Sequence, residues 1–107
     1  MATYTFIANY KGGIYVRQVN ARNTLHACHV WAGEIIKWQD IPDLDLSKFS
    51  KSFHNDMEDL PPVALQDTPN VWGFSVGSGR NFVIINVVKT DMKTIETPAL
   101  ERIAEIM

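Results

Sequence analysis

The chain has 107 residues, of which 46% are hydrophobic and 21% charged, and its formal net charge is −2. These values are typical of one globular domain and exclude a wholly disordered chain, because enough apolar surface is available to offset the loss of chain entropy. Cys28 is the only cysteine, which excludes an intramolecular disulfide and a cysteine-rich zinc site. The chain opens without the pattern of a secretory signal, and no run approaches the roughly 18 apolar residues that span a membrane. We therefore expect a cytoplasmic protein.

Two strands joined by a hairpin turn are predicted first. Residues 3–9 alternate between two faces, with Tyr4, Phe6 and Ala8 on one of them, which is the period of a half-buried strand. Residues 14–19 continue in residue types that favour strands. Two consecutive glycines lie between the segments and permit the positive φ angles of a tight turn.

A helix should follow the hairpin. Asn23 or Thr24 can cap its first turn by accepting a hydrogen bond from a backbone amide. Apolar residues then recur at steps of three and four up to about Trp38, which predicts one face packed on the sheet. These residues are Leu25, Cys28, Trp31, Ala32, Ile35 and Ile36.

Residues 39–70 read as an insertion. Four prolines interrupt this segment, which argues against a long regular element. Short helical turns are expected near residues 43–49 and 52–59, with the insertion partly ordered.

The insertion is also the acidic part of the chain. Residues 40–67 contain seven acidic residues and two lysines, a net charge of −5, whereas residues 1–39 carry +3. Such a charge repels nucleic acid and attracts a cationic protein surface. An ordinary solvated loop remains the alternative.

A second hairpin is predicted over residues 71–76 and 81–89. Residues 82–88 are nearly all apolar, which indicates a central strand covered on both faces or a strand half covered by a partner. Thr97 and Pro98 then resemble a helix cap followed by proline at the first helical position. The closing helix would place Leu100, Ile103, Ala104 and Met107 along one side.

Together these elements predict a single α+β domain over residues 1–107. The expected architecture is a four-stranded, mainly antiparallel sheet of two hairpins, with helices packed on one face, in the order ββα, insertion, ββα. Edge strands of two copies can pair, so a homodimer is compatible with this arrangement.

No catalytic, metal or cofactor site is predicted. His26 and His29 have a spacing that can bind a metal, but a third ligand is missing nearby, and hydrogen-bonded or solvated histidines are the simpler interpretation. Cys28 falls on the apolar stripe, where a thiol behaves as a small hydrophobic group. Residues 77–80 lack the spacing of a phosphate-binding loop and fit a hairpin turn. The carboxylates form no recognisable acid–base pair.

Protein binding is the remaining class of function, and aromatic side chains near turns are the best candidates for contacting a partner. Trp31 is expected in the core. Trp72 either fills the core between helix and sheet or lies on a strand face that the core does not need. Trp38 stands out because it lies beside Asp40 and Asp43. The predicted partner-binding residues are Tyr10, Tyr15, Trp38, Asp40, Asp43, Asp45, Asp56, Glu58 and Asp59.

The opening segment over residues 4–19, followed by a helix with Ala27, Trp31 and Ala32, resembles small bacterial immunity proteins. These proteins are encoded beside polymorphic toxins, including those of contact-dependent growth inhibition systems. The resemblance covers about the first third of the chain and implies a cytoplasmic protein that binds its cognate toxin domain and blocks the active site or substrate entry. Many such toxins are nucleases with basic surfaces, which the acidic insertion would match.

The same opening also looks like the small α+β domain of antitoxins, although no DNA-binding module is visible. A non-catalytic adaptor or antitoxin-like subunit is therefore the alternative function.

Overall fold

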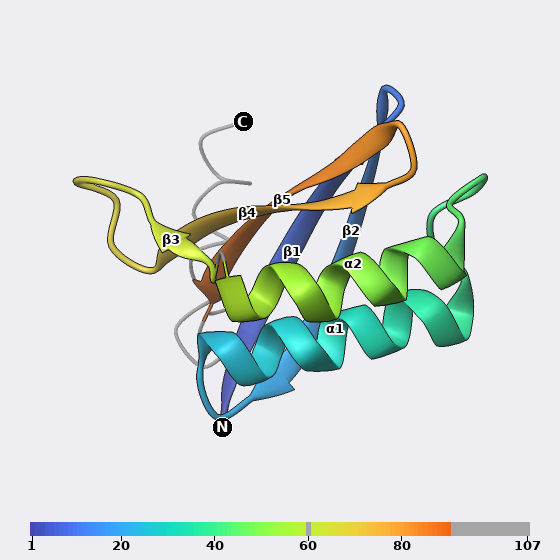
Figure 1. The fold of residues 1–107 in the computed structure, drawn as a ribbon. Helices are drawn as coiled ribbons and strands as arrows, with labels where there is room; N and C mark the ends of the chain where they lie inside the picture. Colours follow the sequence, from blue (N-terminus) through green and yellow to red (C-terminus); the bar gives the residue numbers. More distant parts are fainter. Residues whose placement is uncertain (60, 91–107) are drawn as a thin grey trace, which may run out of the picture.

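The computed structural model describes residues 1–59 and 61–90, which form one antiparallel sheet with two helices on one face (Figure 1). The strands are β1 (Ala2–Tyr10), β2 (Gly13–Ala21), β3 (Val63–Ala64), β4 (Val71–Ser78) and β5 (Asn81–Thr90). Their order in the sheet is β2-β1-β5-β4-β3. The class is α+β, but the prediction of four strands was wrong because β3 adds a fifth.

The two-residue strand β3 left no periodic signal in the sequence. Val63 pairs with Gly73 and Ala64 with Trp72, so β3 extends the sheet beyond β4. Alternation cannot be detected over two residues, and only their pairing with β4 identifies them as a strand.

Both predicted hairpins are present, each closed by a two-residue turn. Lys11 and Gly12 have φ angles of 48° and 81°, the pattern of a turn with two left-handed residues. In the second hairpin Gly79 alone has a positive φ, of 68°. Both geometries match the twist of antiparallel strands. The hairpins then join through β1 and β5, where Phe6 lies opposite Val87.

The first helix, α1 (Thr24–Trp38), begins and ends close to the predicted positions. The side chain of Asn23 accepts a hydrogen bond of 2.8 Å from the backbone N–H of His26 and so caps the helix. The face toward the sheet buries Ala27, Cys28, Trp31, Ala32 and Ile35.

The insertion contains a continuous helix, α2 (Leu46–Asp59), so the prediction of separate short helical turns was wrong. Pro42 precedes this helix and Pro61 follows it, so the prolines bound it instead of interrupting it. Asp45 caps its first turn by accepting a hydrogen bond of 3.1 Å from the backbone N–H of Lys48. The buried side chains Phe49, Phe53 and Met57 recur every four residues and attach α2 to the core.

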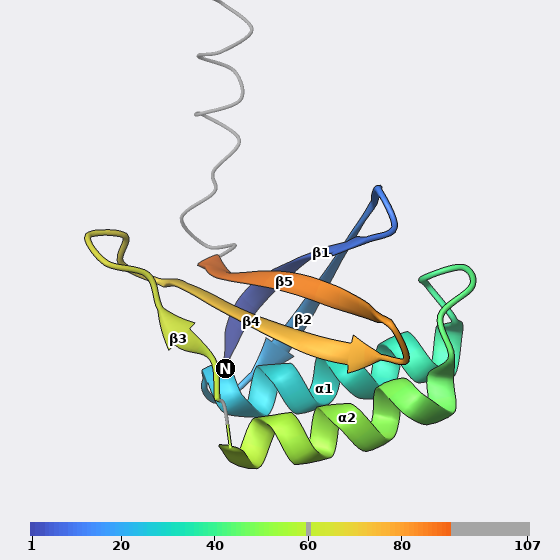
Figure 2. The ribbon, with the colours of Figure 1, turned by 45° about the horizontal axis from the view of Figure 1, so that its top comes forward.

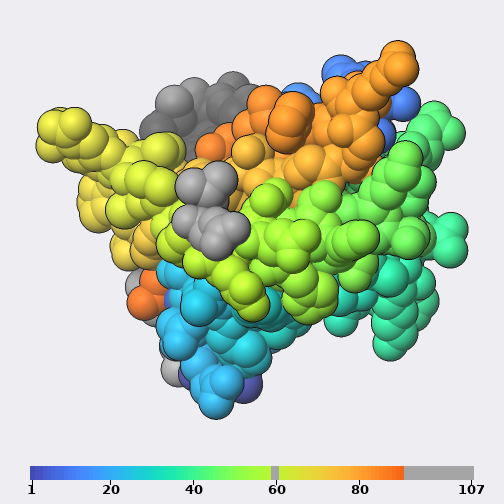
Figure 3. Space-filling model, viewed as in Figure 1, coloured from blue at the N-terminus to red at the C-terminus, as the bar shows by residue number. Residues whose placement is uncertain are grey.

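The two helices lie side by side and antiparallel on the same face of the sheet (Figure 2). In the space-filling view they form a continuous surface over it (Figure 3). Trp31 lies at the centre of the core between the helices and the sheet. Its ring stacks on Phe6, with 5.2 Å between the centroids, and it meets Phe49 and Phe74 edge-on. Within the described ranges, no helix is long and apolar enough to cross a membrane.

The closing helix predicted from Pro98 to Met107 lies outside the described residues.

Cys28 gives this core a measurable dependence on pH. Burial raises the pKa of its thiol from 9.0 to about 12, because the thiolate is poorly solvated in the apolar interior. In the unfolded chain the thiol ionises at its ordinary pKa. Its stabilising effect on the free energy of unfolding is therefore fully present below pH 9 and is lost as the pH rises from 9 to 12. By pH 10 the wild-type free energy of unfolding should have fallen about 1.4 kcal/mol further than that of Cys28→Ala. Urea unfolding at pH 7 and pH 10 measures the difference, and parallel losses in the two proteins would contradict it.

Candidate functional site

Trp38 is the last residue of α1, and 58% of its surface is exposed. The helix ends there because Gln39 adopts a left-handed conformation and donates its N–H to the carbonyl oxygen of Ile35 at 2.9 Å. Trp38 is seven residues beyond Trp31 and three beyond Ile35, so it continues the apolar stripe that α1 buries. It is exposed because the stripe runs past the part of the helix that the fold covers.

The exposed indole is held in place by two neighbours. Its Nε1–H donates to a carboxylate oxygen of Glu34 at 2.5 Å, one turn earlier in the helix. The Nζ atom of Lys37 lies over the ring, 4.9 Å from its centroid. An aromatic side chain fixed in this way loses little conformational entropy when a partner covers it.

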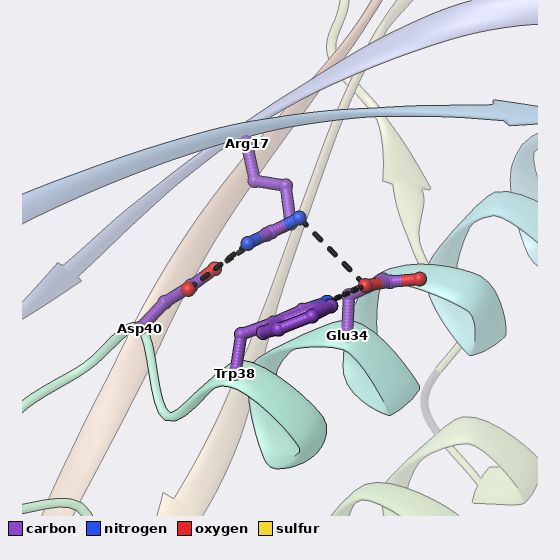
Figure 4. Close-up of polar contacts among 4 residues, drawn as sticks. All are labelled: Arg17, Glu34, Trp38 and Asp40. Carbon is purple, nitrogen blue, oxygen red and sulfur yellow. Dashed lines mark hydrogen bonds and ion pairs between the residues drawn. The ribbon is translucent and has the colours of Figure 1, made fainter.

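Arg17 connects this end of the helix to β2. Its guanidinium donates two hydrogen bonds to the carboxylate of Asp40, through Nε to Oδ2 and through Nη2 to Oδ1 at 3.0 Å, and its Nη1 lies 3.7 Å from Glu34 (Figure 4). The hydrogen bond to Asp40 raises the pKa of Arg17, whose guanidinium is charged throughout the physiological range in any case. We call Arg17, Glu34, Trp38 and Asp40 the Trp38 cluster.

A hollow of about 320 Å³ lies beside the Trp38 cluster. It is lined by Ile14, Tyr15, Val16, Arg17, Ile35 and Asp40. β2 contributes most of this wall, and among the described strands its only neighbour is β1, so β2 is an edge of the sheet. A hollow that combines a charged pair with the backbone of an edge strand is suited to binding a protein segment.

The acidic residues of the insertion do not gather into one patch. Asp40 is engaged with Arg17, Asp45 caps α2, and Asp43 is exposed in the loop between the helices. Asp56 and Glu58 lie at the far end of α2, about 20 Å away along a helix that rises 1.5 Å per residue. Lys48 and Lys51 lie between the two groups.

These five acidic side chains differ in exposure. Glu58 is exposed, and Asp56 is half-buried. The side chain of the sixth, Asp59, lies outside what the structure describes.

Of the two predicted tyrosines, Tyr10 does not lie on the surface, so the expectation that the core leaves its side chain free for a partner was wrong. Only 4% of Tyr10 is exposed, because it shares the covered face of β1 with Tyr4, Phe6 and Ala8. Tyr15 is half-buried and lines the hollow beside the Trp38 cluster.

The residues considered for catalysis or metal binding have structural surroundings. His26 accepts a hydrogen bond from the backbone N–H of Arg22 at 3.0 Å, and His29 packs edge-on against Phe53. Cys28 is fully buried. In the part of the chain that the structure describes, no three histidine, cysteine or carboxylate side chains are grouped to hold a metal ion.

Sequence reasoning missed Arg17 and Glu34. The alternation of β2 puts Arg17 on the same face as Val19, toward the helices, and Glu34 precedes Trp38 by one helical turn. Both spacings were available in the sequence, but the ion pair depends on how α1 lies across β2.

No protein-family model, curated protein or solved structure matches the chain. The resemblance of residues 4–19 to immunity proteins therefore stays a prediction.

The contribution of the Arg17–Asp40 pair can be measured with a double-mutant cycle. Because the two side chains remain 30% and 24% exposed, solvent screens their attraction, and we expect a coupling energy of roughly 0.5–1 kcal/mol. The variants are Arg17→Met, Asp40→Asn and their combination, compared by urea unfolding at low and high salt. The coupling should shrink at high salt. Additive effects at low salt would show that the pair does not stabilise the attachment of α1 to β2.

Proposed function

We propose that this protein is an immunity protein, a non-catalytic cytoplasmic protein that binds the toxin domain of its own polymorphic toxin or contact-dependent growth inhibition system. It would neutralise the toxin by covering its active site or substrate-binding surface. The observation that carries the proposal is Trp38, a largely exposed tryptophan fixed by Glu34 and Lys37 beside a hollow at an edge strand.

Trp38 has the properties of an interface anchor. Tryptophan is the residue type most enriched among side chains that dominate binding energy, since it buries a large apolar area with few rotatable bonds. Here the indole N–H is already satisfied by Glu34, so a partner can cover the ring without leaving a buried donor unpaired. The adjacent hollow supplies a place for a partner side chain.

The charges near Trp38 favour a cationic partner. Glu34, Asp40 and Asp43 lie at this end of the molecule, and Arg17 and Lys37 neutralise part of their charge. Acidic groups around an aromatic anchor suit the basic substrate-binding surface of a nuclease toxin, where they would replace the phosphates of its substrate. Asp56 and Glu58 are too distant to contact the same small area and would act through long-range attraction.

An adaptor or antitoxin-like subunit would use the same anchor for a different partner. Identification of the bound protein separates the two functions, so it is the first experiment.

The binding role of Trp38 is tested by expressing the tagged full chain in its native host and identifying the proteins that co-purify. We expect a stoichiometric toxin domain with the wild type, and an affinity reduced by about 30-fold or more, equivalent to about 2 kcal/mol, with Trp38→Ala. Leu25→Ala is the matched control, because Leu25 is an exposed apolar residue at the opposite end of α1. Equal affinities for the two variants would remove Trp38 from the interface, and recovery of an assembly without a toxin would favour the adaptor function.

The acidic side chains should affect the rate of association unequally. With the purified toxin domain, Asp43→Ser should slow association by about twofold to threefold at low salt, since Asp43 lies near Trp38, whereas Glu58→Ser should have a smaller effect. Both effects should vanish at high salt. Stopped-flow mixing measures the rates, and a larger effect of Glu58→Ser would move the interface to the far end of α2.

A further inference from the structure

The outer edge of β2 is long and unprotected. The strand has nine residues, and in the described part of the chain it has a neighbour on one side only. It contains no proline, and it pairs with β1 continuously at every residue from 13 to 21. Its single charged side chain, Arg17, points toward the helices and is bound to Asp40. Edge strands are usually blunted by prolines, bulges or outward charges, so β2 has none of the common barriers to pairing with another chain.

The turn before β2 determines which of its backbone groups face outward. Tyr10 and Gly13 flank the two-residue turn and form a hydrogen-bonded pair, and such pairs alternate along the ladder with pairs that are not hydrogen-bonded. The N–H and C=O groups of Ile14 and Val16 therefore point away from β1. The side chains of these two residues lie on the face away from the helices, so it is their backbone that lines the hollow of about 320 Å³ beside the Trp38 cluster.

The opposite edge of the sheet is better protected. The strand β3 pairs with β4 as far as Gly73, and beyond it the same alternation leaves only Ser75 and Gly77 with outward backbone groups. Lys48 of α2 reaches this end of β4, since its Nζ lies 3.8 Å from the position that a Cβ on Gly79 would take. A lysine at an edge opposes strand pairing, so β2 is the edge that favours it.

We propose that two copies of this chain associate through β2, whose strands pair antiparallel about a twofold axis at Tyr15 and join the two sheets into one. Ile14 then lies opposite Val16 of the second copy, and Val16 lies opposite Ile14. Each of these pairs exchanges two backbone hydrogen bonds through the outward groups. A contact of this kind uses the same strand on both copies and closes at two of them.

The side chains suit this register. Ile14 and Val16 are 67% and 63% exposed, and β-branched side chains directly opposite each other stabilise strand pairing. On the other face Gly13 lies opposite Arg17 of the second copy. A Cβ added at Gly13 would collide with the ring of Tyr15, so this ring already covers the glycine and comes next to Arg17 of the second copy.

Charge does not oppose the contact. An axis at Arg17 would place two guanidinium groups opposite each other, whereas an axis at Tyr15 separates them by four residues along the strand, about 13 Å at 3.3 Å per residue. Each guanidinium also remains bound to Asp40 of its own copy. The net charge of −2 per chain adds little long-range repulsion.

A second copy at this edge fills the hollow beside the Trp38 cluster, so the dimer and the complex with a toxin exclude each other. Few residues pair on each strand, which makes the dimer a weak complex that a tightly bound toxin displaces. The inference does not rest on the proposed function, because it is tested on the purified chain alone.

Sedimentation equilibrium of the purified full chain measures the association. Between about 5 µM and about 500 µM the average mass should rise from one chain toward two, as expected for a Kd in the micromolar range. Val16→Lys should raise the Kd at least about tenfold, because it places a charge at the paired edge. Val63→Lys is the matched control and should leave the Kd unchanged, since Val63 is an equally exposed valine (66%) on the opposite edge strand β3.

Amide hydrogen exchange followed by NMR identifies the strand that pairs. At the higher concentration the outward N–H groups of Ile14 and Val16 should exchange at least about fivefold more slowly than at the lower one. The N–H groups of Tyr15 and Arg17 already bond to β1, so their exchange should change little.

Each other result would overturn the proposal. A chain that stays single at every concentration would exclude the dimer. Equal effects of Val16→Lys and Val63→Lys, or slower exchange that does not alternate along β2, would place the contact elsewhere. Assemblies larger than two copies would mean that β2 pairs with a different edge of the next copy.

Discussion

The placement of Trp31 is the constraint on which the rest of the structure depends. Its ring stacks on Phe6 of β1 and meets Phe49 of α2 and Phe74 of β4 edge-on, so one side chain of α1 joins three other elements. Aromatic pairs at these separations add to the free energy of burying their area. Because Trp31 fills the space between sheet and helices, α1 and α2 must share one face of the sheet, and the other face receives no helix from the described residues.

The same packing leaves the end of α1 uncovered. The apolar stripe continues from Trp31 through Ile35 to Trp38, and at Trp38 more than half of the side chain is exposed. Arg17 binds Asp40 and Glu34 at that position and ties the helix end to β2, an edge strand. The exposed indole of Trp38, the charged cluster and the neighbouring hollow therefore occur together at the end of α1, where the helix runs past its packing surface.

The helix α2 changes the meaning of the acidic insertion. A loop would allow seven acidic residues in residues 40–67 to gather, whereas a 14-residue helix holds its ends about 20 Å apart. Asp45 becomes a helix cap and Asp40 an ion-pair partner, so part of the charge stabilises the fold. A net charge calculated along the sequence is thus a poor guide to a surface patch when a regular element runs through the segment.

The sequence by itself determined the local structure that depends on neighbouring residues: the two hairpins, the capped helix α1 and the burial of Trp31 and Cys28, all of which follow from periodicity and turn chemistry. It also contained the alternation that buries Tyr10, which was assigned to the surface from its position beside a turn. Only the tertiary structure decided that β1 pairs with β5, that β3 exists and that α2 is one continuous helix, because these features depend on contacts between distant segments. It likewise decided that Arg17 meets Asp40 and that Trp38 stays exposed, since the place where a stripe ceases to be covered is set by the extent of the opposing surface, which local sequence does not encode.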